Sequence, residues 1–317
     1  MKAQSSSLTI NQRPDGQVAG SAYACAHHGE LIQGAFEWHD GSLRRALVSL
    51  PLRSKHAFAT FKPDSQIGVR VQPTDRHKAA RAAELALQKL NLNVHGGSLE
   101  IRSDIPIGHG YGSSSADVVA AVKAVFDAFG RTASATIASE IAVAAERASD
   151  AIAFEETSVL FAHRDGIVLE YLGGDLPPLA LISFKSSDAS PISTTALSRA
   201  RYNADEIQAF RCALSAVRRA VLYQDPMLLG RAASLSARIS QQHLAKNGFS
   251  RAQEVADRHG ASGLQVSHSG SLFGIMMDAS QPKLNARLSA IALDIQNAGF
   301  TDVEQLSISA EHNFDDR

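Results

Sequence analysis

The chain has 317 residues, of which 44% are hydrophobic and 20% charged, so it can bury a sizeable core and divide into two lobes. Its formal net charge is -1, and no basic run exceeds Arg44-Arg45, which argues against a nucleic-acid partner. Cys25 and Cys212 have no metal-binding spacing, and no segment approaches the roughly 18 apolar residues of a membrane span. We therefore expect a cytoplasmic protein with no membrane partner.

The first half of the chain predicts strands followed by helices. A polar leader, residues 1–18, is expected to be flexible. Short, partly alternating segments then predict β-strands at 21–36, 45–52, 55–61, 67–72 and, ending at Pro106, 96–106. Apolar residues at helical spacing predict helices at 75–91, from Ser113 to Gly130, and at 134–148.

The second half predicts three further strands, a boundary and a second mixed region. The strands are 157–163, 166–172 and 178–184, and the region beyond them holds helices at 204–223, 226–244, 249–258 and 283–298, a strand pair within 264–278 and a strand at 301–308. The Ser- and Pro-rich segment 185–193 marks the boundary between an N-terminal lobe, 19–187, and a C-terminal lobe, 188–317. This order predicts an α+β fold rather than a regular doubly wound sheet.

The sequence IPIGHGYGSSSAD, residues 105–117, places Gly108, Gly110 and Gly112 between a strand and a helix that begins at Ser113. Glycines expose backbone N–H groups, and a helix N-terminus attracts negative charge, so the stretch predicts an anion-binding loop. The serine hydroxyls add donors and can ligate Mg²⁺. A glycine turn leading into a Ser-capped helix is the structural alternative. The loop has neither the Lys of a Walker A motif nor the spacing of a Rossmann fingerprint.

Residues 106–115 resemble the phosphate loop of the GHMP small-molecule kinases, Pro-x-x-x-Gly-Leu-Gly-Ser-Ser-Ala, with Tyr111 for Leu and Ser115 for Ala. GELIQG (29–34) and SHSGSLFG (267–274) resemble the first and third motifs of the L-threonine kinases of cobalamin synthesis and propanediol utilisation. One departure is that Cys25-Ala26 stands where the first motif carries Pro-Gly. The resemblance implies a two-lobed GHMP-kinase-like fold, with an N-terminal mixed β-sheet lobe, a C-terminal α/β lobe and the nucleotide between them.

The resemblance also implies ATP and Mg²⁺ as cofactors. It assigns the nucleotide phosphates to Pro106, Gly108, His109, Gly110, Tyr111, Gly112, Ser113, Ser114 and Ser115. It assigns the metal to Ser114 and Glu146, whose oxygens suit Mg²⁺. Asp150 is the catalytic candidate, as the residue that accepts or orients the substrate hydroxyl proton. The alternatives are a solvated helix residue for Glu146 and a cap or turn acid for Asp150.

The candidate substrate residues lie in the first and third motifs and are Glu30, Gln33, His268, Ser269 and Gly270. The alternatives are polar residues that satisfy backbone groups at strand ends, and a plain β-turn at 268–270. We do not expect His27 and His28 to bind a metal together, because adjacent residues on a strand point to opposite faces.

These residues predict ATP-dependent phosphorylation of the side-chain hydroxyl of a small amino acid, with L-threonine, giving O-phospho-L-threonine, as the favoured acceptor. Serine, homoserine or an amino acid of a specialised pathway remain alternative acceptors. A regulator that binds nucleotide or metabolite without catalysis is the alternative of another class. The partners are expected to be ATP and the small acceptor, and a homodimer is left open.

Overall fold

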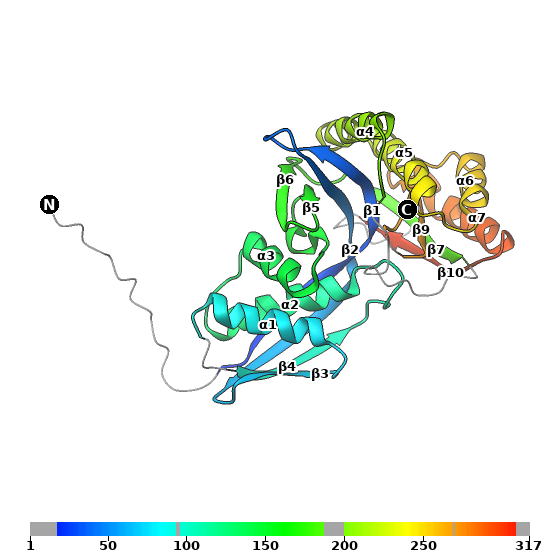
Figure 1. The fold of residues 1–317 in the computed structure, drawn as a ribbon. Helices are drawn as coiled ribbons and strands as arrows, with labels where there is room; N and C mark the ends of the chain where they lie inside the picture. The colour runs from blue at the N-terminus through cyan, green and yellow to red at the C-terminus, as the bar shows by residue number, and fades with distance from the viewer. Residues whose placement is uncertain (1–17, 93–95, 187–199, 269, 309–317) are drawn as a thin grey trace.

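The structure is a computed structural model, and it describes residues 18–92, 96–186, 200–268 and 270–308. Nearly all of the expected leader, and the expected boundary at 187–188 with the residues that follow it, lie outside the described residues. Helices and strands are mixed along the chain, as an α+β fold requires (Figure 1).

The described strands join in one sheet of ten. They are β1 (Gly20–Glu37), β2 (Leu43–Asp64), β3 (Gly68–Gln72), β4 (Gly96–Ser103), β5 (Val159–Ala162), β6 (Ile167–Tyr171), β7 (Leu179–Ser186), β8 (Gly263–Val266), β9 (Leu272–Asp278) and β10 (Phe300–Ser307). The main order is β10-β7-β9-β8-β1-β2-β4-β3, and β5 pairs with β2 and β6.

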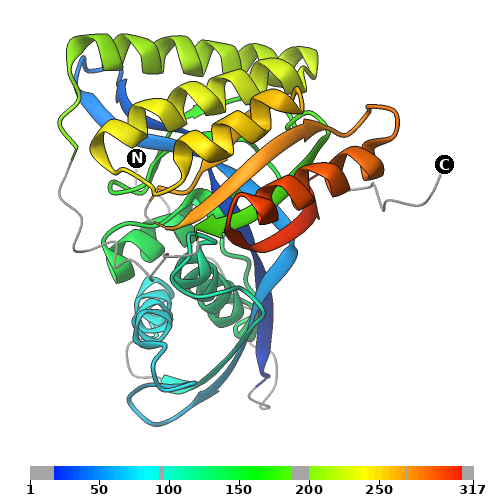
Figure 2. The same ribbon diagram turned by 90° about the vertical axis from the view of Figure 1, so that its right-hand side faces the viewer.

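The helices cover this curled sheet. They are α1 (His77–Lys89), α2 (Ser113–Ala128), α3 (Ala135–Glu146), α4 (Ala204–Tyr223), α5 (Pro226–His243), α6 (Phe249–Arg258) and α7 (Leu284–Asn297), with a 3₁₀ turn, η1, at Ala151–Phe154. Figure 2 shows α4 and α5 side by side at one end of the molecule and α1 and α2 at the other. Within the described residues, none of the helices combines the length and the apolar character that crossing a membrane requires.

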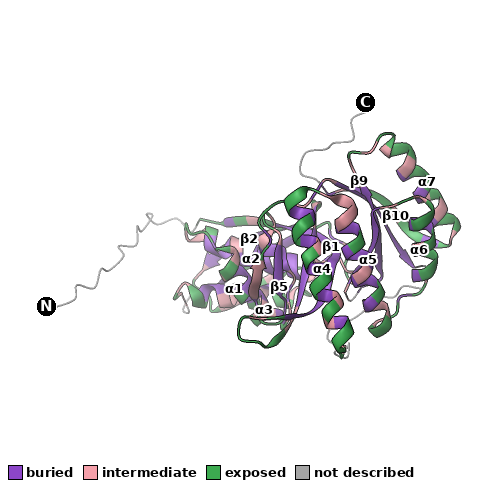
Figure 3. Cartoon of the chain, turned by 90° about the horizontal axis from the view of Figure 1, so that it is seen from above, coloured by how far each residue is buried: buried purple, intermediate pink, exposed green. Residues whose placement is uncertain are grey.

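The long strand β1 runs through both halves of the molecule. At its start, an added Cβ on Gly20 would lie 2.1 Å from the backbone of Ala128 in α2. Towards its end, a Cβ on Gly34 would lie 2.5 Å from the ring of Phe210 in α4. Because helices pack closely on β1 at both ends, residues from Ala24 to Phe36 are buried, as the purple interior of Figure 3 shows.

Three boundaries differ from the sequence prediction. Segments 45–52 and 55–61 form the single strand β2 rather than two strands, because its pairing with β1 continues across Pro51 through an irregular register. The strand expected to end at Pro106 ends at Ser103. Helix α3 ends at Glu146, because Arg147 adopts a left-handed conformation with φ +68°.

Strand β7 lies with the C-terminal strands, although the sequence analysis put it in the N-terminal lobe. It pairs with β9 on one side and β10 on the other. A separate apolar cluster under α6 and α7 includes Phe184 of β7, stacked at 5.4 Å on Phe273 of β9. The division at residue 187 stays a prediction, and β7 packs with the second half because its strand partners come from there.

Candidate active site

The glycine loop has left-handed backbone angles at each glycine, with φ +81° at Gly108, +103° at Gly110 and +71° at Gly112. Two backbone hydrogen bonds tie the loop to β1. The N–H of His27 donates to the carbonyl of Tyr111 over 3.1 Å, and that of Gly29 to the carbonyl of Gly110 over 3.3 Å. The loop is therefore fixed against the strand that carries the GELIQG motif.

The turn between β8 and β9 packs on the same loop. A Cβ added to Gly110 would lie 2.5 Å from Cβ of Ser267, and one added to Gly270 would lie 2.0 Å from the carbonyl oxygen of His109. Such approaches leave no room for side chains, so both positions need glycine. The β8–β9 turn therefore packs on the glycine loop through Ser267 and Gly270, while Ser269 lies outside the described residues.

Helix α2 begins directly after Gly112, and no side chain caps its N-terminus. Its first turn contains no acidic residue, so no side chain of the helix itself neutralises the N–H groups of Ser113, Ser114 and Ser115. Uncapped N–H groups and the helix dipole both favour an anion at this position. The loop and helix therefore fit a phosphate group.

The loop residues do not all face this position. Tyr111 is buried, and its hydroxyl lies 3.1 Å from Oγ of Ser183 on β7. His109 lies 3.3 Å from Oγ of Ser271 through Nδ1. The side chain of Tyr111 therefore faces β7, so Tyr111 could contact a bound phosphate only through its backbone.

The two residues predicted to hold Mg²⁺ are in direct contact. Oγ of Ser114 donates to Oε2 of Glu146 over 2.7 Å, and Oγ of Ser115 donates to Oε1 over 2.7 Å. Glu146 is buried, which excludes the solvated helix residue. Burial raises the pKa of Glu146, and the hydrogen bonds from Ser115 and Ser114 and the charge of Lys78 oppose the rise. Hard oxygen donors beside an anion site fit Mg²⁺.

Lys78, in the first turn of α1, contacts both Ser114 and Glu146. It was not among the site residues predicted from the sequence. Its Nζ lies 3.1 Å from Oγ of Ser114 and 3.5 Å from Oε2 of Glu146. The side chain is about half exposed, so its ammonium group can also reach ligands at the helix N-terminus. Its position at the start of the helix predicted for 75–91 gave no signal, because the contact joins residues 36 positions apart.

Asp150 precedes η1 and points to His27 of β1. Oδ2 of Asp150 lies 2.9 Å from Nε2 of His27, and Nδ1 of His27 lies 3.0 Å from the carbonyl oxygen of Gly29. A carbonyl oxygen and a carboxylate can only accept, so both ring nitrogens carry a proton and His27 is an imidazolium. Burial opposes its charge, but the Asp150 carboxylate and Glu30 outweigh burial and raise the pKa of His27 to about 9.

The carboxyl group of Asp150 also faces the start of α2. Its Oδ2 lies 3.5 Å from Oγ of Ser115, and its backbone N–H donates to the same hydroxyl over 3.3 Å. Burial opposes the charge of Asp150, but the interaction with His27 outweighs it and lowers the pKa of Asp150 to about 2. Asp150 is therefore an ionised carboxylate beside the predicted phosphate site, held there by a turn rather than by a continuing helix.

His27, Glu30 and Asp150 place possible metal-ligand atoms within 4.8 Å of one another. A ligating imidazole must offer a lone pair, and both nitrogens of His27 donate to oxygens instead. The cluster is therefore an ion-paired network rather than a metal centre. His28 points elsewhere, to Gln265 and Ser183 at 2.9 and 2.8 Å, which confirms that the two histidines do not act together.

The predicted substrate residues meet on the other side of Asp150. The backbone N–H of His268 donates to Oε2 of Glu30 over 2.5 Å, and Nδ1 of His268 contacts Oε1 of Gln33. Burial raises the pKa of Glu30 to about 7, against the opposing charge of His27. Lys246, also missed by the sequence analysis, reaches the carbonyl of Gly270. Glu30, Gln33 and the β8–β9 turn therefore form one polar wall.

A cavity of about 480 Å³ lies behind η1. His27 and Ile152 line it, together with residues of β2 and of the segment before β7, and none of the serines at the start of α2 does. The cavity therefore does not include the helix N-terminus that is predicted to bind phosphate.

The sequence matches the family described as GHMP kinases N terminal domain over residues 77–155. It is 29% identical over 271 residues to an L-threonine kinase of Salmonella typhimurium strain LT2, covering 83% of this chain and 84% of that protein. The fold is similar to that of homoserine kinase from Cytophaga hutchinsonii, with a TM-score of 0.69 at 16% identity, covering 95% and 98% of the two chains.

A second similar structure is MDDEF, solved in complex with MVAPP, AMPPCP and magnesium. Its TM-score is 0.63 at 15% identity, covering 92% of this chain and 100% of that chain. The family match falls on the segment that contains the glycine loop, Glu146 and Asp150. With the alignment over most of the chain to L-threonine kinases, this match identifies a GHMP kinase N-terminal domain at residues 77–155 and indicates a small-molecule kinase.

Proposed function

We propose that this protein transfers the γ-phosphoryl group of ATP, with Mg²⁺, to the side-chain hydroxyl of a small amino acid, and that L-threonine is the acceptor. The observation that supports this most is the position of Asp150. Its carboxylate lies beside Ser115 at an uncapped helix N-terminus, within the same network as Ser114 and Glu146. A regulator that only binds nucleotide has no need for an ionised acid at this position.

Phosphoryl transfer requires charge neutralisation and positioning more than covalent chemistry from the protein. The N–H groups at the start of α2 and the ammonium of Lys78 would bind the phosphate oxygens. Ser114 and Glu146 would hold Mg²⁺, which when bound supplies positive charge against the transferred group. The complex of the similar chain MDDEF with AMPPCP and magnesium supports these cofactors.

Asp150 would orient the acceptor hydroxyl and accept its proton. Both hydrogen bonds described for its side chain are made by Oδ2, which leaves Oδ1 to face an acceptor. A carboxylate with a low pKa is a weak base, so its contribution comes from position and from exclusion of water. His27 holds the carboxylate in this orientation through Oδ2, the same oxygen that lies near Ser115.

The acceptor assignment is supported by the threonine kinase of Salmonella, which aligns over most of both chains. The similar fold of a homoserine kinase supports the wider class of hydroxy amino acids. The test is ADP release with Mg²⁺-ATP and L-threonine, L-serine or L-homoserine, with Asp150→Asn as the comparison. We expect the wild-type protein to release ADP with L-threonine and Asp150→Asn to lose most of this turnover. ATP binding without acceptor-dependent ADP release would favour the regulator instead.

A further inference from the structure

One face of the sheet beside Asp150 carries polar side chains to which the proposed mechanism gives no role. Leu47 of β2 pairs with Gln33 of β1 on one side and with Phe161 of β5 on the other. Side chains alternate along strands, so two residues further in this antiparallel register Arg45 lies beside His163. Gln33, Arg45 and His163 therefore share one face.

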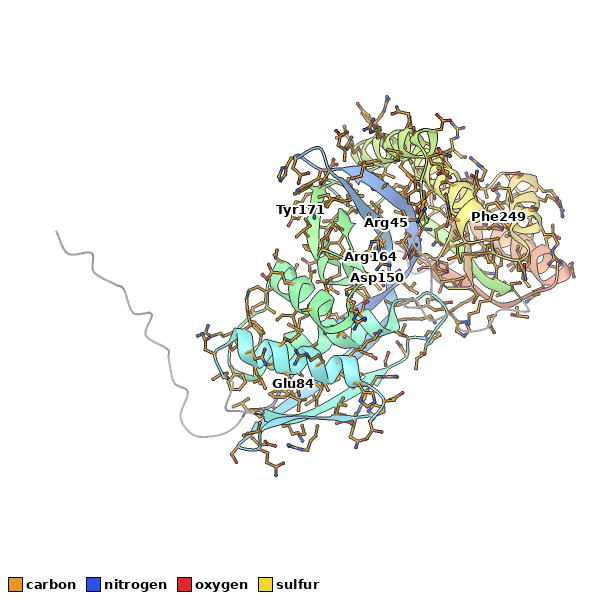
Figure 4. All side chains as sticks on the ribbon, in the orientation of Figure 1. Arg45, Glu84, Asp150, Arg164, Tyr171 and Phe249 are labelled. Atoms are coloured by element: carbon orange, nitrogen blue, oxygen red, sulfur yellow. The ribbon has the colours of Figure 1, made fainter. Side chains whose placement is uncertain are left out.

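This face adjoins the catalytic candidate. The ring of His163 lies 5.7 Å from that of His268, which in turn contacts Gln33. The backbone N–H of Ser149, next to Asp150, donates to the carbonyl of His163 over 2.9 Å. Figure 4 shows Arg45, Arg164 and Asp150 close together in the same region between β5 and β1.

The charge of Arg45 has no acidic partner among the described residues. Its guanidinium donates to the carbonyl of Ala200 and lies 5.4 Å from the ring centre of Tyr202, and both partners are neutral. The adjacent Arg44, on the opposite face, forms ion pairs instead, at 3.8 Å with Asp40 and 3.3 Å with Asp165. One of two neighbouring arginines is thus neutralised and the other is not.

His163 adds a ring nitrogen that lacks a partner. It is 8% exposed, and its Nδ1 has no hydrogen-bond partner within the part of the chain that the structure describes. Burial lowers the pKa of His163 to about 3, and the positive charges of Arg164 and Arg45 contribute to the lowering. A neutral imidazole with an unused nitrogen in a field of positive charge suits a ligand anion.

We propose that Arg45 and His163 bind the carboxylate of the acceptor, while the acceptor hydroxyl faces Asp150. This rests on the proposed function and specifies it, because it makes the substrate a hydroxy acid with a free carboxylate rather than a neutral alcohol or a sugar. Arg45 is then a specificity-determining residue: it binds the ground state and the transition state equally, so its loss acts on KM.

The test compares Arg45→Gln with Arg44→Gln as the matched control, each with L-threonine and with L-threoninamide, in which a neutral amide replaces the carboxylate. We expect the wild-type protein and Arg44→Gln to prefer L-threonine by on the order of 10²-fold in kcat/KM. Arg45→Gln should lose most of this preference through a higher KM for L-threonine, with the KM for ATP unchanged. Arg45→Lys keeps the positive charge but loses the coplanar N–H donors of the guanidinium. Its preference for L-threonine over L-threoninamide should therefore lie between those of the wild-type protein and Arg45→Gln.

The outcomes separate the two proposals. Wild-type protein that uses the amide as well as the acid, or an Arg45→Gln variant that discriminates as Arg44→Gln does, would overturn the carboxylate site while leaving the kinase intact. If neither L-threonine nor its serine and homoserine counterparts gives ADP release, the proposed function fails and this inference fails with it. Thermal unfolding of the arginine variants shows whether a lost preference reflects lost folding, and Arg45→Lys still tests the site if Arg45→Gln does not fold.

Discussion

Nε2 of His27 lies 2.9 Å from Oδ2 of Asp150, although 123 residues separate the two along the chain. The contact joins the strand that carries the first motif to the turn that follows α3. Since the other ring nitrogen donates to Gly29, His27 is fixed by two hydrogen bonds and carries a positive charge. The orientation of the catalytic candidate therefore depends on a residue that lies far from it in the sequence.

This ion pair predicts that the stability contributed by His27 depends on pH. The pKa of His27 rises from 6.5 to about 9 on folding, so its contribution is complete below pH 6.5 and is lost as pH rises through 9. The pKa of Asp150 falls from 3.8 to about 2, so its contribution is complete above pH 3.8 and is lost as pH falls through 2. We expect the difference in Tm between wild type and His27→Gln to be largest between these limits and to shrink towards pH 9.

The exposed His39 provides the control, because His39→Gln should leave Tm unchanged throughout. Thermal unfolding from about pH 4 to about pH 9.5 gives the measurement, because this range spans both the ordinary pKa of His27 and its raised value. A gap between wild type and His27→Gln that stays constant from pH 6.5 to pH 9 would show that the pair is not ionic.

Asp150→Asn should separate catalysis from nucleotide binding. The asparagine keeps the size of the side chain but cannot accept a proton, so turnover should fall by on the order of 10² to 10⁴. ATP affinity should change little, because the residue faces the acceptor. Glu156→Gln, an exposed acid in the same segment, is the control and should retain wild-type turnover. Turnover of Asp150→Asn within about threefold of wild type would remove the acid from the mechanism.

Local sequence patterns predicted the helices to within two residues at either end, because helical periodicity and capping act over a few residues. Motif resemblance singled out Glu146 and Asp150, and both lie near the hydroxyl of Ser115 at the start of α2. Arg147 ends the helix between the two acids, so they do not share a helix face. The alternation of side chains along a strand predicted that His27 and His28 point to opposite faces. It could not predict that His27 pairs with Asp150, 123 residues further along the chain. The contacts of Lys78 and the pairing of β7 with β9 and β10 were not predicted for the same reason: they join residues far apart in the sequence.

The contact between Ser114 and Glu146 predicts a change in metal requirement. Ser114→Ala and Glu146→Gln each remove one oxygen ligand or its charge, so the Mg²⁺ concentration for half-maximal rate should rise by about tenfold. Folding should be preserved in Glu146→Gln, because a neutral amide replaces a buried carboxylate whose pKa is already raised. The control is Glu140→Gln, an exposed residue of the same helix. Unchanged Mg²⁺ dependence in both variants would place the metal ligands elsewhere.

Gly112 lies between the phosphate loop and the His27–Asp150 pair. Its replacement by alanine should disturb both the loop backbone and the contact between His27 and Asp150. Its φ is +71°, where an L-residue costs about 1–2 kcal/mol, and an added Cβ would lie 2.2 Å from Cδ2 of His27. The ring of His27 is held at both nitrogens and cannot move aside without breaking the bond to Asp150.

Gly166→Ala is the control, because it measures the cost of a left-handed backbone conformation without a clash of the added methyl group. Gly166 has nearly the same φ, +72°, but its added Cβ would meet its nearest neighbour, Val143, at an ordinary 3.4 Å. We expect Gly166→Ala to lower the free energy of unfolding by about 1–2 kcal/mol and leave turnover unchanged. Gly112→Ala should cost more stability, and its turnover should approach that of His27→Gln, because the clash displaces the same imidazolium. If denaturant unfolding and ADP release showed equal effects of the two alanines, contact with His27 would not be what requires glycine at position 112.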